Sequence, residues 1–251
     1  DRTSQRLFGQ PGDHDGYEAL LFDGRTAYLT MEEAGREGEP HCGCGWLLRG
    51  RVEGCRGARI LRLTTACLLP PPPGWNAGKV DNKSYESLVL HGGTIHALWE
   101  CQGRRPLPGR PMAATLPTRF QARSPVRWTP IERMEYRTTD ASSLDPRTSR
   151  FWVLSYHFAI DPGGCDAEPD VHAKDKQANS DGAHEHIERL LELQRTRGGL
   201  RRTATPPIWL ELEAKARNWE GLTRLRAPRR GLDGFVVATD KWPGSLGFVR
   251  R

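Results

Sequence analysis

The sequence lacks any run of about twenty consecutive apolar residues, which excludes a transmembrane helix of ordinary length. It also lacks a Gly-rich phosphate-binding loop, a Gly-x-Ser-x-Gly nucleophile elbow and a His-Glu-x-x-His zinc helix, so these common enzyme signatures are missing. No segment recurs at a fixed spacing. The chain starts at Asp1 without a methionine or an apolar signal region, as a processed or trimmed product would. These absences favour a soluble, intracellular protein.

The composition is that of a folded protein with many loops. Apolar residues make up 37% of the 251 residues, and the 8 tryptophans argue against disorder. The 27 glycines and 19 prolines predict numerous turns. A chain of this length forms one large domain or two small ones, with a sizeable buried core.

The positive charge is bunched along the chain. The net charge is +6, and arginine clusters occur at 195–197, 201–202, 224–226, 229–230 and 250–251. Such clusters provide the sequence-independent attraction to phosphate that nucleic-acid-binding proteins use. A GC-rich genome also produces abundant arginine, alanine, glycine and proline without selection for a function. Nucleic acid, either DNA or RNA, is the partner that the charge favours.

The six cysteines leave two interpretations open. Their even number is compatible with disulfides, although a chain of this size does not need a disulfide framework. A zinc site formed by His41, Cys42, Cys44 and Cys55 would use sulfur and imidazole ligands. The Cys-x-Cys spacing is tighter than an ordinary zinc knuckle, and no second paired knuckle follows. We therefore favour reduced structural cysteines over Zn²⁺.

The first half of the sequence predicts short strands joined by turns. Asp23-Gly24 and Gly92-Gly93 are hairpin signals between apolar runs. The strands are expected at 17–22, 26–30, 58–69, 87–91 and 94–99. Residues 1–149 are therefore expected to form a β-rich portion that positions nucleic acid.

The second half predicts a mixture of strands and helices. Ser180-Asp181 is a helix N-cap signal, and the spacing of Ile187, Leu190 and Leu191 is typical of one helix face. Gly198-Gly199 would end this helix. A second helix is expected at 217–226, and strands are expected at 150–160, 207–216 and 234–239. The whole chain is thus expected to be α+β, with residues 150–251 forming an α/β portion with a mixed sheet.

One segment points to a specific chemistry. Glu211, Glu213 and Lys215 alternate on the expected strand 207–216, so their side chains would share one face. Mg²⁺ is held by few carboxylates and keeps several waters, so two acids suffice as protein ligands. A hard cation stabilises the charge that develops on a phosphate during hydrolysis, and a lysine can orient the attacking water. The same alternation is also common on a solvated strand face without a catalytic role.

Pro169-Asp170 followed by Glu213-Ala214-Lys215 resembles the PD-(D/E)xK signature of restriction-type and repair nucleases. The resemblance covers about the last third of the chain. It implies that Asp170 and Glu213 bind the metal, with Glu211 as an additional ligand, and that Lys215 activates water. Asp161 or Asp181 could replace Asp170 as the first acid, because a helix is expected between Asp170 and Glu213.

Two histidine groups offer competing interpretations. His91 and His96, followed by Arg110, resemble the distal histidine and 2-oxoglutarate-binding arginine of a double-stranded β-helix oxygenase. The His-x-Asp iron-binding pair of such an enzyme is missing, and His41 would have to replace it. His184 and His186 would face nearly opposite ways on a helix, so they do not form a chelating pair.

The leading hypothesis is a Mg²⁺-dependent nuclease that hydrolyses phosphodiester bonds in DNA or RNA. The alternative is a non-catalytic basic nucleic-acid-binding or scaffold protein of a larger assembly. An iron/2-oxoglutarate oxygenase is a third option.

Overall fold

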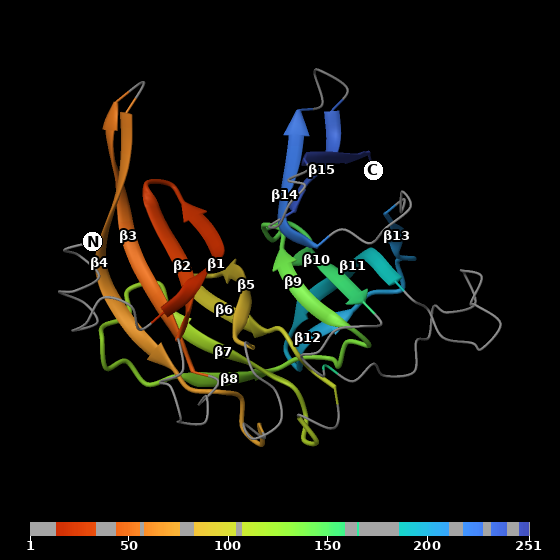
Figure 1. The fold of residues 1–251 in the computed structure, drawn as a ribbon, viewed down its shortest axis with the longest axis horizontal. Helices are drawn as coiled ribbons and strands as arrows, with labels where there is room; N and C mark the ends of the chain where they lie inside the picture. Colours follow the sequence, from red (N-terminus) through yellow and green to blue (C-terminus); the bar gives the residue numbers. More distant parts are fainter. Residues whose placement is uncertain are drawn as a thin grey trace.

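A computed structural model describes residues 14–33, 44–55, 58–75, 83–103, 107–158, 165, 186–210, 218–227, 232–239 and 246–250. These residues form strands and turns, with no helix among them. The strands make four antiparallel sheets, each of which follows chain order from one edge to the other (Figure 1). Within the described ranges, no helix long and apolar enough to cross a membrane occurs.

Each sheet is built from one contiguous part of the chain. The first contains β1 (His14–Asp23), β2 (Thr26–Glu33), β3 (Gly45–Cys55) and β4 (Ala58–Leu69). The second contains β5 (Tyr85–His91), β6 (Thr94–Trp99), β7 (Met112–Pro117) and β8 (Arg127–Pro130). The third contains β9 (Arg137–Ala141), β10 (Arg150–Phe158), β11 (His186–Thr196) and β12 (Gly199–Arg202), with β13 (Ile208–Trp209) paired to β11. The fourth contains β14 (Trp219–Ala227), β15 (Leu232–Thr239) and β16 (Leu246–Arg250).

The four sheets are the blades of a four-bladed β-propeller. The first strand of each sheet lies near the centre, where β1 contacts β5, β5 contacts β9, and β9 contacts β14 (Figure 1). The later strands of each sheet lie farther out. We number the blades 1 to 4 in chain order, and a seam is the region between two neighbouring blades.

Among the described residues, three seams contain a hydrophobic cluster that joins two blades. One cluster packs Leu21 and Leu47 of blade 1 against Tyr85 and Trp99 of blade 2. The next joins blades 2 and 3, and a third joins blades 3 and 4. The middle blades are therefore apolar on both faces, as in β10, where Val153 faces one cluster and Leu154 the other. Burial of these side chains stabilises the ring by roughly 1.5–3 kcal/mol per large residue.

Several predicted strands are confirmed. The hairpin signals hold because Gly24, Gly92 and Gly93 have positive φ angles, which the tight turns between paired strands require. The strands expected at 58–69, 150–160 and 234–239 correspond to β4, β10 and β15.

The predicted α+β class is wrong, because the fold is all-β. The segment between Ser180 and Gly198 that we expected to be helical contains β11, whose Ile187, Leu190 and Leu191 are buried on two faces of a strand. The helix expected at 217–226 is β14. The expected boundary at residue 149 falls between β9 and β10, which pair within blade 3.

Candidate functional site

The innermost strands share a short sequence pattern that sequence analysis missed. In three blades an aromatic residue is followed by glutamate, a small residue and leucine. These segments are 17–20 (Tyr-Glu-Ala-Leu) in β1, 85–88 (Tyr-Glu-Ser-Leu) in β5 and 219–222 (Trp-Glu-Gly-Leu) in β14. Blade 3 has Tyr136-Arg137 at the same place. The spacing between the copies is irregular, which is why a search for a fixed period does not find them.

The pattern has a structural cause, because each of these three strands has a β-bulge at this position. Tyr85 pairs with Trp99 and Ser87 pairs with Leu98, so Glu86 is an extra residue without a partner across the ladder. Glu220 is the extra residue in β14 in the same way. A bulge redirects a side chain and is frequent beside functional sites. The glutamates are therefore displaced from the regular alternation of their strands.

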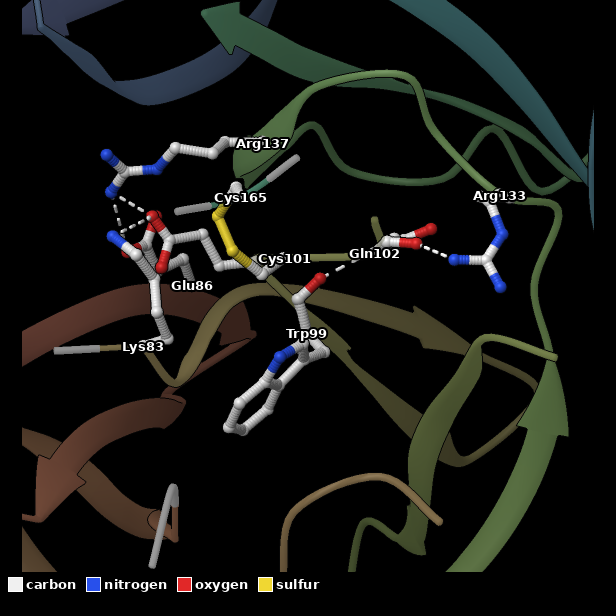
Figure 2. Close-up of a disulfide and its surroundings, with 9 residues drawn as sticks. Lys83, Glu86, Trp99, Cys101, Gln102, Arg133, Arg137 and Cys165 are labelled. Carbon is white, nitrogen blue, oxygen red and sulfur yellow. Dashed lines mark hydrogen bonds and ion pairs between the residues drawn. A yellow bond between two sulfur atoms is a disulfide. The ribbon is translucent and has the colours of Figure 1, made fainter. Parts of the chain in front are cut away.

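The central charge cluster joins blades 2 and 3 (Figure 2). Arg137 of β9 forms an ion pair with Glu86 Oε1 at 3.7 Å and a closer one with Glu100. Lys83 Nζ lies 3.4 Å from Glu100 Oε1. Cys101, next to Glu100, is joined by a disulfide to Cys165, which ties the end of β6 to the segment between β10 and β11. The cluster is therefore fixed by both covalent and ionic contacts.

Burial and neighbouring acids raise the pKa of Glu86 in the central charge cluster. Desolvation raises the pKa of Glu86 well above its usual value, and the charges of Glu18 and Glu220 raise it further. The positive charges of Arg137 and Lys83 oppose this shift. Carboxylates from three innermost strands thus act on one another electrostatically at the centre of the propeller.

Asp140 connects the innermost strands of blades 3 and 4. Its carboxylate accepts hydrogen bonds from the backbone N–H groups of Leu222 at 2.6 Å and of Ala141 at 2.7 Å. Burial nevertheless raises the pKa of Asp140 to about 8, because desolvation outweighs the two donors. A carboxyl group in an unfolded chain has a pKa of about 3.9.

We expect the Asp140→Asn variant to change how stability depends on pH. Between pH of about 4 and 8, Asp140 binds more protons in the folded state than in the unfolded state. Its favourable contribution is therefore complete below the unfolded pKa and is lost as the pH rises through the folded pKa. The variant should flatten this decline by up to about 1.4 kcal/mol per pH unit. Urea unfolding at several pH values measures it, and parallel curves for the two proteins would contradict the expectation.

A basic pocket of about 540 Å³ lies on blade 2 at its seam with blade 3. Its floor consists of hydroxyl and imidazole groups on three paired strands. Thr115 Oγ1 lies 2.9 Å from Thr129 Oγ1 and 3.3 Å from His96 Nδ1. The rim consists of His91, Ser124, Arg127 and Arg195, the last of which comes from blade 3. The pocket is therefore assembled from residues distant in sequence.

The electrostatic field of this pocket favours an anion. Burial, together with the charges of the nearby Arg195 and His91, lowers the pKa of His96 to about 4, so His96 is neutral at neutral pH. None of the described lining residues is acidic. The Nε of Arg195 is buried and has no hydrogen-bond partner within the part of the chain that the structure describes. Arginine and hydroxyl groups around such a space match the chemistry of a phosphate group.

The acids and the lysine predicted from sequence lie outside the described residues. This holds for Asp170, Glu211, Glu213 and Lys215, and for the alternative acids Asp161 and Asp181. Their convergence on Mg²⁺ stays a prediction. His91 and His96 do lie together, but in the basic pocket. The described residues contain no group of three or more His, Cys, Asp or Glu side chains placed to hold a metal ion.

The cysteines differ from the reduced state that we favoured. Cys101 and Cys165 form a disulfide, and Cys44 is also disulfide-bonded. Cys67 is a buried free thiol, and burial raises its pKa. The structure does not describe His41, Cys42 or the side chain of Cys55. The alternative zinc site at His41, Cys42, Cys44 and Cys55 is therefore not tested.

No protein-family model and no curated protein matches the sequence. The fold therefore defines the class, which is that of an all-β, four-bladed β-propeller. The resemblance to the PD-(D/E)xK nucleases is wrong. It requires a helix after the motif strand, whereas the residues expected to form this helix belong to β14, which hydrogen-bonds to β15 along its length.

Proposed function

We propose that this protein is a non-catalytic β-propeller that binds nucleic acid through phosphate contacts in the basic pocket between blades 2 and 3. The observation that carries the proposal is that two arginines, Arg127 of blade 2 and Arg195 of blade 3, line one pocket. The described residues around this pocket include no acid. Arg127 is exposed, and its guanidinium can approach a phosphate without losing an existing buried contact.

The size and chemistry of the pocket support this proposal. A volume of about 540 Å³ lies within the ordinary range of ligand pockets, roughly 300–1,000 Å³. Phosphate oxygens accept hydrogen bonds from guanidinium groups in a bidentate way and from hydroxyls such as those of Thr115 and Thr129. The net charge of +6 adds a long-range attraction to a polyanion.

We expect the double variant Arg127→Ala/Arg195→Ala to lose nucleic-acid affinity and part of the salt dependence of binding. Each phosphate contact that is removed should lower the slope of log Kd against log salt by about 1. Fluorescence anisotropy with labelled single-stranded and double-stranded DNA and with RNA, over a series of salt concentrations, measures both effects. This set of probes also shows which nucleic acid is preferred.

The matched control is Arg62→Ala on blade 1. Arg62 is an exposed arginine whose ion pair with Glu53 spans 3.0 Å, so its removal changes net charge far from the pocket. Arg127→Ala and Arg195→Ala are also measured singly for this comparison. If Arg62→Ala lost as much nucleic-acid affinity as either of them, net charge alone would account for binding and the pocket assignment would fail.

Hydrolysis, which the sequence predicted, is tested in the same samples with Mg²⁺ added. The non-catalytic proposal expects intact nucleic acid after incubation. Metal-dependent cleavage that disappears in Glu213→Ala and Lys215→Ala would instead support the nuclease hypothesis and reject the non-catalytic one.

A further inference from the structure

Each blade has an aromatic residue at the position of the repeated pattern, and this residue is buried in blades 2, 3 and 4 and exposed in blade 1. Tyr85 is 0% exposed, Tyr136 is 7% exposed and Trp219 is 4% exposed, whereas Tyr17 of blade 1 is 49% exposed. Tyr85 packs in the cluster between blades 1 and 2, and Trp219 packs in the cluster between blades 3 and 4. The equivalent residue of blade 1 belongs to the remaining seam, between blades 4 and 1.

The face of blade 1 that carries Tyr17 is apolar across all four strands. Leu20 and Phe22 of β1 point to this face, and they are 55% and 56% exposed. Their partners across the ladder are Leu29 and Ala27. The corresponding residues in the next strands are apolar or glycine, and they include Trp46, Leu48, Gly50, Val52, Leu61, Leu63, Ala66 and Leu68. A large apolar face with an exposed part marks a binding surface.

The exposed part of this face forms a groove of about 740 Å³ with a basic rim. Leu20, Phe22 and Leu61 supply apolar walls, while Arg25 and Arg59 lie at the edge. Among the described residues that line the groove, none is acidic. We call this surface the seam groove.

Blade 4 presents a second apolar wall on the same seam. Ala238 of β15 and Tyr17 of β1 line one shared pocket, so this face of blade 4 is turned toward blade 1. Leu246 pairs with Ala238 and is therefore on the same face, where it is highly exposed. Phe248 lies on this face as well and is also exposed. The seam thus has apolar surfaces on both sides, and among the described residues no hydrophobic cluster joins them as in the other three seams.

We propose that the seam groove is the docking site for an acidic amphipathic segment of a protein partner. Its apolar side chains would contact Leu20, Phe22 and Leu61, and its carboxylates would pair with Arg25 and Arg59. The commitment to an acidic partner rests on charge complementarity, because the rim carries two arginines beside an apolar floor. The other three seams show that the equivalent positions become buried when an apolar face covers them.

Two synthetic peptides test the proposal on the whole protein. One peptide alternates leucine with glutamate and the other alternates leucine with lysine. We expect the first to bind with at least about tenfold higher affinity, as measured by fluorescence anisotropy. Leu20→Ser/Phe22→Ser should weaken this binding about tenfold or more, because the two apolar contacts are removed. Arg25→Glu/Arg59→Glu should reverse the preference toward the lysine peptide.

The control is Ile60→Ser, an exposed apolar residue of β4 that pairs with Glu53 on the opposite face of blade 1 and does not line the groove. This variant should bind the glutamate peptide as the unchanged protein does. Equal binding of the two peptides, or unchanged binding in Leu20→Ser/Phe22→Ser, would overturn the proposal. Dimerisation in light scattering that is abolished by Leu20→Ser/Phe22→Ser would also overturn it, since a second copy would then fill the groove. Nucleic-acid binding at the basic pocket should stay the same in Leu20→Ser/Phe22→Ser and in the control, which keep the net charge, so the two proposals fail independently.

Discussion

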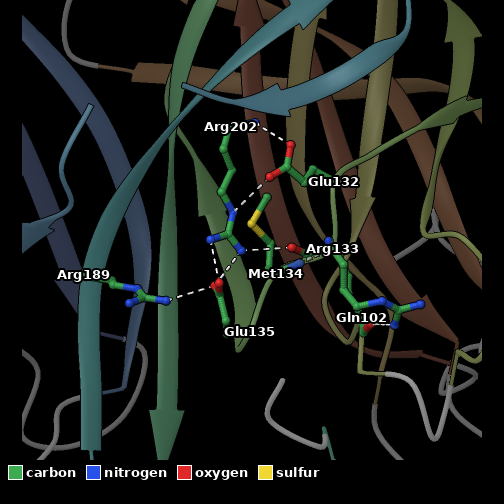
Figure 3. A network of polar contacts seen from close by, with 7 residues as sticks. All are labelled: Gln102, Glu132, Arg133, Met134, Glu135, Arg189 and Arg202. Carbon is green, nitrogen blue, oxygen red and sulfur yellow. Dashed lines mark hydrogen bonds and ion pairs between the residues drawn. The ribbon is translucent and has the colours of Figure 1, made fainter. Parts of the chain in front are cut away.

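Replacing Glu135 by alanine is expected to destabilise the protein by about 3–5 kcal/mol, the cost of leaving a buried charge without its partner. Glu135 lies between blades 2 and 3 and forms ion pairs with two arginines of blade 3 (Figure 3). Arg189 on β11 is completely buried, and its guanidinium donates to Glu135 Oε2 at 3.0 Å. Arg202 on β12 donates to both carboxylate oxygens, at 2.6 Å and 2.5 Å.

The aromatic contacts of Arg189 do not replace the lost carboxylate. Its guanidinium lies 5.2 Å from the ring centres of both Tyr136 and Trp209. Such contacts contribute about 0.5–2 kcal/mol each, and they persist in the variant. They therefore reduce the loss without cancelling it.

Glu132→Ala is the matched control for Glu135→Ala. Glu132 is more exposed, and its Oε1 lies 3.9 Å from Arg202 Nε, so it contributes a weak surface pair. We expect a loss below about 1 kcal/mol for this variant. Urea unfolding of both variants measures the difference in free energy of unfolding. Equal losses would show that the buried ion pairs of Glu135 stabilise the fold no more than the exposed pair of Glu132.

Removing the Cys101–Cys165 disulfide is the second change with a large expected effect. The two cysteines are 64 positions apart, and a cross-link over such a distance stabilises a fold by about 4 kcal/mol in the chain-entropy model. We expect Cys101→Ala/Cys165→Ala to lose about this much in free energy of unfolding under oxidising conditions. Guanidinium chloride unfolding with and without a reducing agent provides the measurement.

Cys67→Ala serves as the control, because this buried thiol belongs to no disulfide. It should lose less stability than the double variant and should keep the response to a reducing agent. If the double variant were as stable as the unchanged protein, the tether between β6 and the segment after β10 would contribute nothing to stability. Cys44 is also disulfide-bonded, so the double variant should retain a smaller response to reduction.

The strands of this fold could be predicted where short turns interrupt apolar runs, but the helices were errors with a physical cause. In β14, Trp219 and Leu222 face the same side because Glu220 is an extra residue in the ladder. A three-residue spacing within a strand then imitates one turn of a helix. In β11 the polar Glu188 and Arg189 are buried through specific partners, which hides the alternation expected of a strand.

The two surfaces differ in how much the sequence could indicate. The aromatic-glutamate pattern of the innermost strands is visible in the sequence once irregular spacing is allowed. The basic pocket is not, because Arg195 is brought to Thr115 and Arg127 only by the packing of blade 3 against blade 2. The acid-lysine segment at 211–215 indicated a nuclease through its residue types alone, and such a short motif is a weak indicator of function without a known fold.

The meandering order of the strands has a consequence for how the molecule assembles. Each blade is made by neighbouring stretches of chain, and in the described residues no strand is shared between two blades. Most hairpins of this kind close over short distances, so their formation costs little entropy and is fast, whereas the pair β10–β11 is joined by a long connection. We therefore expect the individual blades to form early and the side-to-side packing of the ring to follow, with blades 4 and 1 meeting last because their strands come from the two ends of the described chain.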